Sequence, residues 1–153
     1  MLAWKLRTDD RVINLERTNF RYVTSNEIPD PLDFASVDVS FISLSIIIPA
    51  LFPLLKENGA AVCLIKPQFE AGKDLVEKGG VVKDKNVHIE VIKNVISCVK
   101  SLEYTIKGLT YSSIKGPAGN IEYLIQSIKS NPDRQLVTED VLKEIFSKFC
   151  LGK

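Results

Sequence analysis

One almost uninterrupted apolar segment, residues 60–65, restricts the fold of this chain more than any other feature. Strands with one face in water alternate apolar and polar residues, whereas a strand buried on both faces is apolar throughout. The segment stops abruptly at Lys66, and the following Pro67 holds that lysine in an extended conformation. We therefore expect the central strand of an α/β sheet, with the amine of Lys66 at its carboxyl end.

Helix-like segments flank this strand on both sides. Residues 86–102 carry apolar side chains at helical spacing. An earlier helix is expected to start at Ser43 or Ser45 and to be kinked or shortened by Pro49 and Pro53. The turn signal Glu-Asn-Gly at residues 57–59 is expected to end it. A last amphipathic helix is predicted at residues 138–149.

Further strand-like segments complete an alternating pattern. They lie at residues 11–16, 34–39, 105–111 and 121–128. The last two are joined by a glycine-containing turn and predict an antiparallel hairpin. The pattern as a whole predicts a doubly wound α/β sheet that ends in this hairpin plus a C-terminal helix. We expect one domain over residues 1–130 and a helical extension over residues 131–153.

Composition excludes several classes of protein. The 153 residues suit one domain, and the net charge of +1 predicts neither nucleic-acid nor membrane binding, so an RNA-binding surface has to be a local patch. None of the three cysteines lies in a Cys-x-x-Cys pair, which favours reduced, buried thiols and a cytoplasmic protein. No apolar run is long enough to span a bilayer, and none resembles a signal peptide.

Three ionisable residues, Asp38, Lys66 and Glu122, stand at or near the ends of strand-like segments. In open α/β sheets, ligands bind outside the carboxyl ends of the strands. We therefore expect the three side chains to form one active site, although a charged residue at a strand end is more often only a solvated rim residue. In such a site a lysine can remove a proton if burial lowers its pKa, and carboxylates can orient it.

Other polar residues are expected to have ordinary roles. His88 is predicted to lie on the surface of a helix, and Trp4 to pack. Residues 66–85 are predicted to form a mobile loop, because they have no clear period and contain three glycines. Its lysines could grip RNA phosphates or could simply be solvated: Lys73, Lys78, Lys83 and Lys85.

Several motifs in order along the chain resemble the TlyA group, FtsJ-like ribosomal RNA 2′-O-methyltransferases that have long been named hemolysins. The resemblance runs from Leu2 to about Ser127. The motifs are Leu-Ala-Trp-Lys-Leu-Arg at 2–7, Leu-Glu-Arg-Thr-Asn at 15–19, Asp-Val-Ser-Phe-Ile-Ser-Leu at 38–44, Ile-Lys-Pro-Gln-Phe-Glu at 65–70, Lys-Gly-Gly-Val-Val at 78–82 and Gly-Asn-Ile-Glu at 119–122.

The resemblance implies a Lys-Asp-Lys-Glu tetrad whose last three members fall on Asp38, Lys66 and Glu122. Lys66 would be the base on a ribose 2′-hydroxyl, and the two acids would orient the reacting groups. The cofactor would be S-adenosylmethionine and the partner ribosomal RNA or a ribosomal subunit, with neither DNA nor a membrane involved. The residues expected around the cofactor or the target are Thr18, Asn19, Phe20, Asp38, Ser40 and Phe41.

The chain departs from the family pattern at its start. Family members place an RNA-binding domain, the first catalytic lysine and a glycine-rich loop before the region matched here, whereas every glycine of this chain lies at Gly59 or later. Backbone amides of such a loop hold the cofactor. We therefore expect a Rossmann-like sheet truncated at its N-terminus, which alone neither binds the cofactor well nor turns over.

The same comparison bears on the sheet. In the family's sheet, two strands that are missing here lie between the strands matched by residues 11–16 and 34–39. The first of these strands thus lacks its neighbours, so an exposed sheet edge is expected and favours a homodimer. The alternative function is a non-catalytic remnant that binds RNA or assembles with a partner. A membrane-lytic hemolysin is disfavoured, because no basic amphipathic helix is present.

Overall fold

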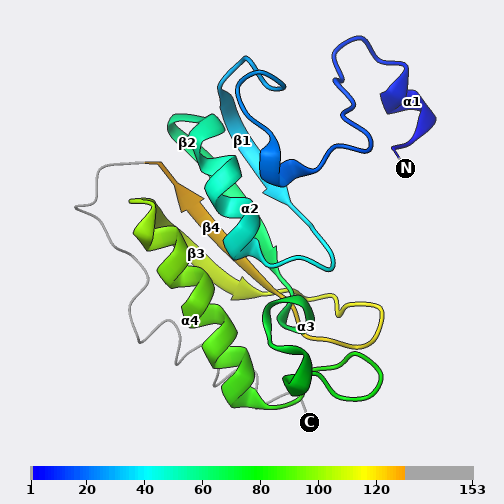
Figure 1. The fold of residues 1–153 in the computed structure, drawn as a ribbon, viewed down its shortest axis with the longest axis vertical. Helices are drawn as coiled ribbons and strands as arrows, with labels where there is room; N and C mark the ends of the chain where they lie inside the picture. Colours follow the sequence, from blue (N-terminus) through cyan, green and yellow to red (C-terminus); the bar gives the residue numbers. More distant parts are fainter. Residues whose placement is uncertain (1, 130–153) are drawn as a thin grey trace.

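A computed structural model describes residues 2–129 of the chain. Four strands form one mixed sheet in the order β1-β2-β4-β3 (Figure 1). β1 is parallel to β2, and β4 is antiparallel to both β2 and β3. The strands are β1 (Leu32–Val37), β2 (Leu55–Ile65), β3 (Thr105–Tyr111) and β4 (Tyr123–Ile128).

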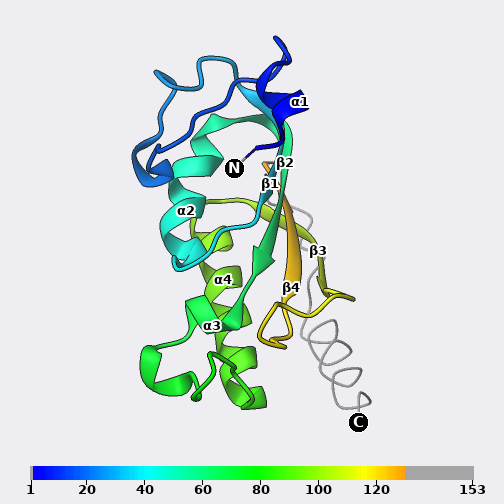
Figure 2. The ribbon, with the colours of Figure 1, turned by 90° about the vertical axis from the view of Figure 1, so that its right-hand side faces the viewer.

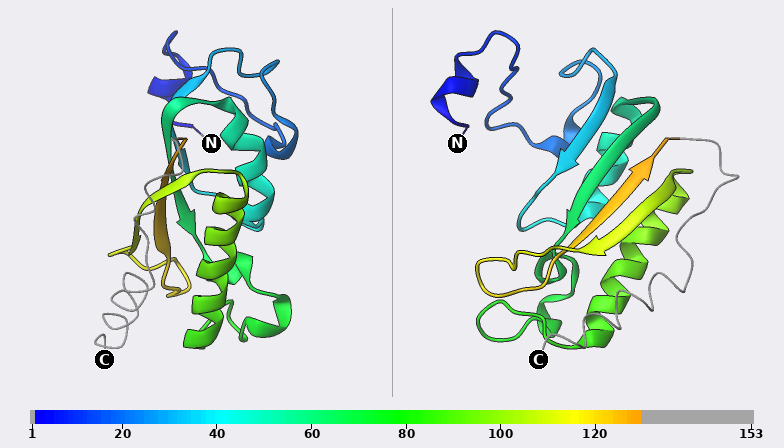
Figure 3. Two further views of the ribbon diagram at one scale, coloured as in Figure 1. Left: turned by 90° about the vertical axis from the view of Figure 1, so that its left-hand side faces the viewer. Right: turned by 180° about the vertical axis from the view of Figure 1, so that it is seen from behind.

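The two longer helices, α2 (Leu44–Leu51) and α4 (Lys85–Ser101), cover one face of the sheet (Figure 2). Seen from behind, the other face of the sheet has no helix of the described residues in front of it (Figure 3). The short helical segments are α1 (Trp4–Arg7), η1 (Phe20–Tyr22), η2 (Phe52–Leu54), α3 (Pro67–Glu70) and η3 (Lys73–Leu75).

The core lies between the sheet and these two helices. On β2, Ala61, Cys63 and Ile65 are buried and alternate with half-buried residues. The buried apolar residues of α4 belong to the same core cluster, and Ile92 among them is fully buried. Burial of each such aliphatic side chain contributes about 1.5–3 kcal/mol. The predicted α/β class and the antiparallel hairpin are confirmed. Within the described residues, however, α2 and α4 cover one face of the sheet, whereas a doubly wound sheet predicts helices on both faces (Figure 2 and Figure 3).

Helix α2 has the form that its prolines predict. Ser43 is the N-cap, and its side chain accepts a hydrogen bond from the amide of Ser45. The α-helix ends at Leu51 and passes directly into η2, which has Pro53 in its first turn. The interpretation of a short helix is confirmed, with Ser43 rather than Ser45 as its cap.

The predicted strand at residues 11–16 is wrong. These residues form no strand, and Ile13 remains 78% exposed. A strand needs a neighbouring strand for its backbone hydrogen bonds, and none of the described strands lies beside this segment. Residues 2–18, called the N-terminal arm below, therefore make an extended excursion away from the sheet (Figure 1). Trp4, expected to pack, is 75% exposed on it.

The expected turn at residues 57–59 is part of β2 instead. The amide of Asn58 donates to the carbonyl of Lys129 at 2.7 Å, and Asn58 has a positive φ of 63°. The pairing of β1 with β2 shifts here, from Leu32 opposite Leu55 to Phe34 opposite Ala60. The strand is thus irregular where the turn was expected, and it starts earlier than residue 60.

The expected mobile loop at residues 66–85 contains α3 and η3 and is anchored by the side chain of Asn120. The Asn120 amide nitrogen donates to the carbonyl of Gly80 at 2.7 Å, and its oxygen accepts from the amide of Val82 at 3.0 Å. Asn120 itself is 1% exposed. A buried amide that satisfies backbone groups of a distant segment fixes that segment to the β3–β4 turn.

His88 is buried, not on the surface as predicted. Its Nε2 lies 2.8 Å from the carbonyl of Val82, which can only accept, so Nε2 carries the proton. Nδ1 then accepts from the hydroxyl of Tyr123 at 3.0 Å. Burial lowers the pKa of His88, and the Val82 hydrogen bond and the charge of Asp84 oppose that effect.

Two expectations concern residues outside the described part of the chain. The helix predicted at residues 138–149 and the extension at 131–153 both fall there.

Within residues 2–129, no helix is long and apolar enough to cross a membrane. Cys63 is buried and Cys98 half-buried, and both are free thiols. Burial raises the pKa of Cys63 to about 12, as expected of an inert core thiol.

Candidate active site

Asp38 and Lys66 meet at one edge of the sheet. Asp38 directly follows β1 and Lys66 directly follows β2, and the two strands are parallel neighbours. The Lys66 Nζ lies 2.5 Å from Asp38 Oδ1 and donates to Ser40 Oγ at 3.3 Å. The Lys66 side chain is only 13% exposed, whereas that of Asp38 is 72% exposed. The predicted amine–carboxylate pair is therefore present, and the carboxylate is its solvent-exposed member.

Glu122 reaches the same edge from the neighbouring strand. Tyr123, the first residue of β4, pairs with Ile65, the last residue of β2, so Glu122 and Lys66 stand one step beyond this pair. Within the described residues, however, the Glu122 carboxylate is 7% exposed and accepts from Gln68 Nε2 at 3.2 Å rather than from Lys66. The third predicted residue is thus at the site but bonded to a different partner.

Gly116 leaves room for the carboxylate of Glu122, which a larger side chain at this position would displace. A Cβ atom at Gly116 would lie 2.6 Å from Glu122 Oε1, well inside a normal contact. The amide of Gly116 also donates to the carbonyl of Asn120 at 2.9 Å. The β3–β4 turn therefore closes tightly over the carboxylate.

An exposed aromatic ring stands beside the Asp38–Lys66 pair. Phe41 is 89% exposed and has a positive φ of 62°, a conformation that costs a non-glycine residue about 1–3 kcal/mol. Its ring centroid is 4.7 Å from that of Phe69. The Lys66 Nζ lies 6.0 Å from the Phe69 centroid. Strained residues of this kind are typical of functional sites.

Thr18 and Asn19, two of the residues expected around the cofactor or the target, form hydrogen bonds within their own segment. Asn19 accepts from the amide of Arg21 at 3.2 Å, and Thr18 Oγ1 donates to the Glu16 carbonyl at 3.4 Å. Phe20 is half-buried against the core. The structure does not bring Thr18 or Asn19 into hydrogen-bonding contact with Asp38 within the described residues.

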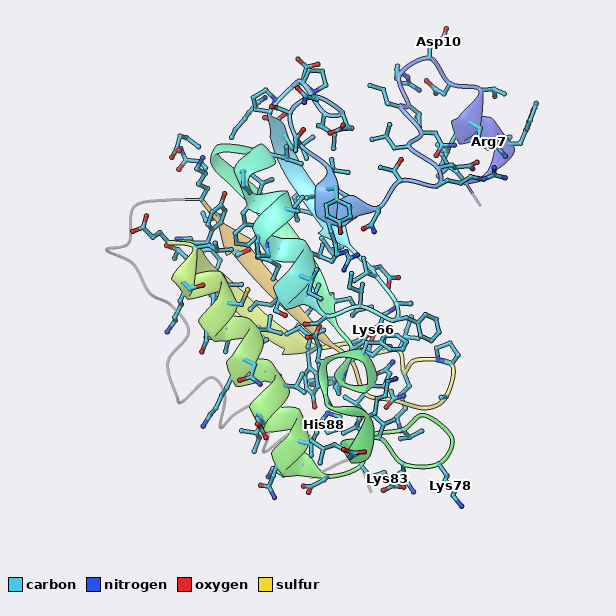
Figure 4. The ribbon with its side chains drawn as sticks, in the orientation of Figure 1. Arg7, Asp10, Lys66, Lys78, Lys83 and His88 are labelled. Carbon is cyan, nitrogen blue, oxygen red and sulfur yellow. The ribbon has the colours of Figure 1, made fainter. Side chains whose placement is uncertain are left out.

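Figure 4 places Lys66 at the end of the sheet, beside α3, and the Lys78 and Lys83 side chains on the loop below it. Lys83 pairs with Glu77 at 2.8 Å. Among residues 2–129, no group of three or more His, Cys, Asp or Glu side chains is arranged to hold a metal ion. The groups that meet at this edge of the sheet are one amine, two carboxylates and neighbouring polar and aromatic side chains.

Sequence reasoning missed Gln68 and Asn120. Gln68 Nε2 bonds the carboxylate of Glu122, and Asn120 anchors the loop before α4. The available signal was their position, because each stands two residues from a predicted catalytic residue. Glu70, the last residue of the motif at 65–70, bonds the start of α2 through both carboxylate oxygens.

The sheet order and the charged groups at its edge define a Rossmann-like methyltransferase fold. The family model for FtsJ-like methyltransferases matches residues 1–129, and the chain belongs to this family. It is 50% identical over 125 residues to the Bacillus subtilis protein named "Putative rRNA methyltransferase YqxC", covering 81% of this chain and 44% of that protein.

Two further similar proteins support the assignment to this family. The Mycobacterium tuberculosis 16S/23S rRNA (cytidine-2'-O)-methyltransferase TlyA is 40% identical over 135 residues, 88% of this chain and 50% of that protein. A crystal structure of a "putative hemolysin" from Lactococcus lactis is 41% identical with a TM-score of 0.83, covering 93% of this chain and 70% of that one. The chain thus spans about half the length of the curated relatives it matches.

Proposed function

We propose that this chain is part of an S-adenosylmethionine-dependent methyltransferase that modifies a ribose 2′-hydroxyl of ribosomal RNA. The observation that carries the proposal is the Lys66 amine, largely withdrawn from solvent and held at 2.5 Å by Asp38 at the meeting of two parallel strands. The printed names of the relatives supply the substrate class. The alternative, a non-catalytic remnant that binds RNA or assembles with a partner, gives no role to that pair.

Lys66 is the base in this proposal. A ribose hydroxyl must lose its proton as it attacks, and a positioned general base typically contributes 10²–10⁴-fold. Asp38 and Ser40 fix the direction of the amine. Glu122, at the same edge, orients the hydroxyl, and the buried position of its carboxylate restricts it to one geometry.

S-adenosylmethionine, when bound, supplies the methyl group. The residues present have the chemical groups needed to bind the adenosyl part of the cofactor, because carboxylate, hydroxyl, amide and aromatic side chains are exposed. No glycine precedes Gly59, so a glycine-rich loop is not among the residues that would hold it. The chain alone is therefore proposed to bind the cofactor weakly. The residues proposed to hold it are Thr18, Asn19, Phe20, Asp38 and Ser40, while Phe41 is proposed to border the target.

Phe41 is proposed to face the target nucleotide. Bases stack on exposed aromatic rings, at about 1–3 kcal/mol per base. Phe41 is exposed and contacts the ring of Phe69, whose centroid lies 6.0 Å from the Lys66 Nζ. Stacking there would bring the attached ribose toward that amine.

The test is transfer of tritium from labelled S-adenosylmethionine to ribosomal RNA by the natural protein that carries this chain. Lys66→Ala is expected to lower the transfer rate by about 10²-fold or more. The matched control is Lys56→Ala, because Lys56 is an exposed lysine at the other end of β2 that pairs with Asp33. Undiminished transfer by Lys66→Ala would remove Lys66 as the base.

Calorimetry separates the enzyme from the remnant. Titration of this 153-residue chain with S-adenosylmethionine is expected to give weak binding. Tight binding excludes the remnant. If the chain binds RNA but does not bind S-adenosylmethionine, the result supports the remnant.

We also propose a homodimer through the edge of β1. β1 is one of the two outer strands of the described sheet, and Phe34 on it is 56% exposed. Unpaired strand edges favour association with another strand. Sedimentation equilibrium is expected to give a dimer, and a concentration-independent monomer contradicts it.

A further inference from the structure

The short segment that begins at Lys66 contacts three other parts of the site. Lys66 bonds Asp38 after β1, Gln68 bonds Glu122 before β4, and Glu70 bonds the start of α2. We propose that Gln68 and Glu70 are positioning residues that hold these separate parts of the chain around the Lys66 amine. This inference rests on the proposed function.

Glu70 fixes the far end of the loop that begins at Asp38. Its Oε1 accepts from the amide of Leu44 at 2.8 Å, and its Oε2 accepts from Ser43 Oγ at 2.6 Å. The first amides of a helix have no partner within the helix, and a carboxylate there is also favoured by the helix dipole. Glu70 thereby supplies to α2, from a segment 26 positions further along the chain, a contact that α2 lacks internally.

The loop from Asp38 to Ser43 is consequently held at three points by one short segment. Its start is bonded to Lys66, its centre contacts Phe69 through the Phe41 ring, and its end is bonded to Glu70. Because Phe41 has a strained backbone and a mostly exposed ring, little else keeps it in place. Loss of the Glu70 contact is expected to release the Phe41 ring.

Gln68 performs the corresponding task for Glu122. Its Nε2 donates to Glu122 Oε1 at 3.2 Å across 54 positions of sequence. Its own Oε1 is buried and has no hydrogen-bond partner among the described residues. A buried acceptor without a partner is energetically unfavourable. The side chain nevertheless keeps the orientation in which its Nε2 donates to the Glu122 carboxylate.

A purely structural role makes a different prediction. If the two residues only stabilised the fold, their loss would lower the rate equally in any background. A positioning residue acts through the group it positions, so its effect disappears once that group is removed. Double-mutant cycles on the rate of methyl transfer therefore distinguish the two roles.

The experiment uses Glu70→Gln and Gln68→Met in the natural protein, alone and combined with Phe41→Ala or Glu122→Gln. Each single change is expected to lower kcat by about ten-fold or more, with KM for RNA changed less. The effect of Glu70→Gln is expected to shrink in the Phe41→Ala background and to persist in the Glu122→Gln background. The effect of Gln68→Met is expected to shrink in the Glu122→Gln background and to persist in the Phe41→Ala background.

The control is Glu57→Gln, which removes an exposed carboxylate that pairs with Lys129 at the opposite end of β2. It is expected to leave kcat unchanged. Additive effects in all cycles, or full kcat in both single variants, overturn the proposal. If Glu70→Gln does not fold, Ser43→Ala removes one of the two Glu70 contacts and is measured instead.

A spectroscopic readout keeps the inference separate from the proposed function. The nuclear Overhauser effect between the Phe41 and Phe69 rings is expected to weaken in Glu70→Gln and to remain in Glu57→Gln. If the unmodified protein transfers no methyl group, the proposed function fails, and a weakened effect still supports the positioning role. An unchanged ring contact in Glu70→Gln overturns it.

Discussion

The N-terminal arm and the body of the molecule, residues 20–129, differ in how their residues find partners. Both contain apolar residues and both contain motifs of the family. In the arm, Trp4 and Ile13 are 75% and 78% exposed, whereas in the body Ile48 and Ile92 are fully buried. Sequence motifs alone therefore do not create packing, because burial requires neighbours that the rest of the chain supplies.

Polar contacts show the same contrast. In the arm, Arg11 bonds Asp9 and Thr8 bonds the carbonyl of Trp4, so partners lie within one turn of chain. In the body, the hydroxyl of Tyr104 donates to the carbonyl of Phe52 at 2.5 Å, 52 positions away. Long-range bonds between buried groups fix a tertiary structure, whereas short-range exposed ones fix only a local turn.

The largest expected difference comes from removing the same side chain in each region. Ile48→Ala is expected to lower the free energy of unfolding by about 2–5 kcal/mol, because it leaves a cavity in the core. Ile13→Ala is expected to change it by less than about 0.5 kcal/mol. Urea unfolding followed by circular dichroism measures both. A comparable loss from Ile13→Ala would show that the arm packs in solution.

A smaller difference is expected between two asparagines. Asn120→Ala removes both bonds to the loop before α4 and leaves the buried amide of Val82 without its acceptor, at about 1–3 kcal/mol. Asn19→Ala loses the exposed cap of the three-residue η1 and is expected to cost about 0.5 kcal/mol, the low end of the range for cap loss. The same urea titration compares them. Equal losses would contradict the role of Asn120 as an anchor.

Elements with a strong local pattern were predictable from the sequence. The helical spacing of residues 86–102 corresponds to α4, and the strand predicted at residues 105–111 is β3. The meeting of Asp38 and Lys66 was predictable too, because parallel neighbouring strands end at one edge of a sheet. Local periodicity and one topological rule were sufficient for these.

Features that depend on a distant partner were not predictable. Residues 11–16 have a strand-like pattern, but a strand also needs a neighbour, which no local pattern reveals. His88 was assigned to the surface because Tyr123, the partner that makes its burial tolerable, lies 35 positions away. The bond of Gln68 to Glu122 was missed for the same reason.

The pH dependence of stability is expected to come from the body. His88 is the only histidine of the chain, and burial lowers its pKa in the folded state below its ordinary value of 6.5. The unfolded state therefore binds the proton more readily, so the free energy of unfolding is constant above about pH 6.5 and falls as the pH decreases toward the folded pKa. Urea unfolding across this range measures the slope, and His88→Gln is expected to abolish it. A slope that survives in His88→Gln assigns the effect to other groups.

The smallest expected effect concerns Trp4, the only tryptophan of the chain. Because its side chain is 75% exposed in the folded protein, its fluorescence is expected to be that of a solvated indole and to be quenched readily by iodide. Trp4→Ala is expected to change the free energy of unfolding by less than about 0.5 kcal/mol. During urea unfolding the emission of Trp4 should stay nearly constant while circular dichroism follows the loss of the body. A cooperative shift of that emission together with the circular dichroism would mean that the arm packs on another surface in solution, and the contrast between arm and body would not hold.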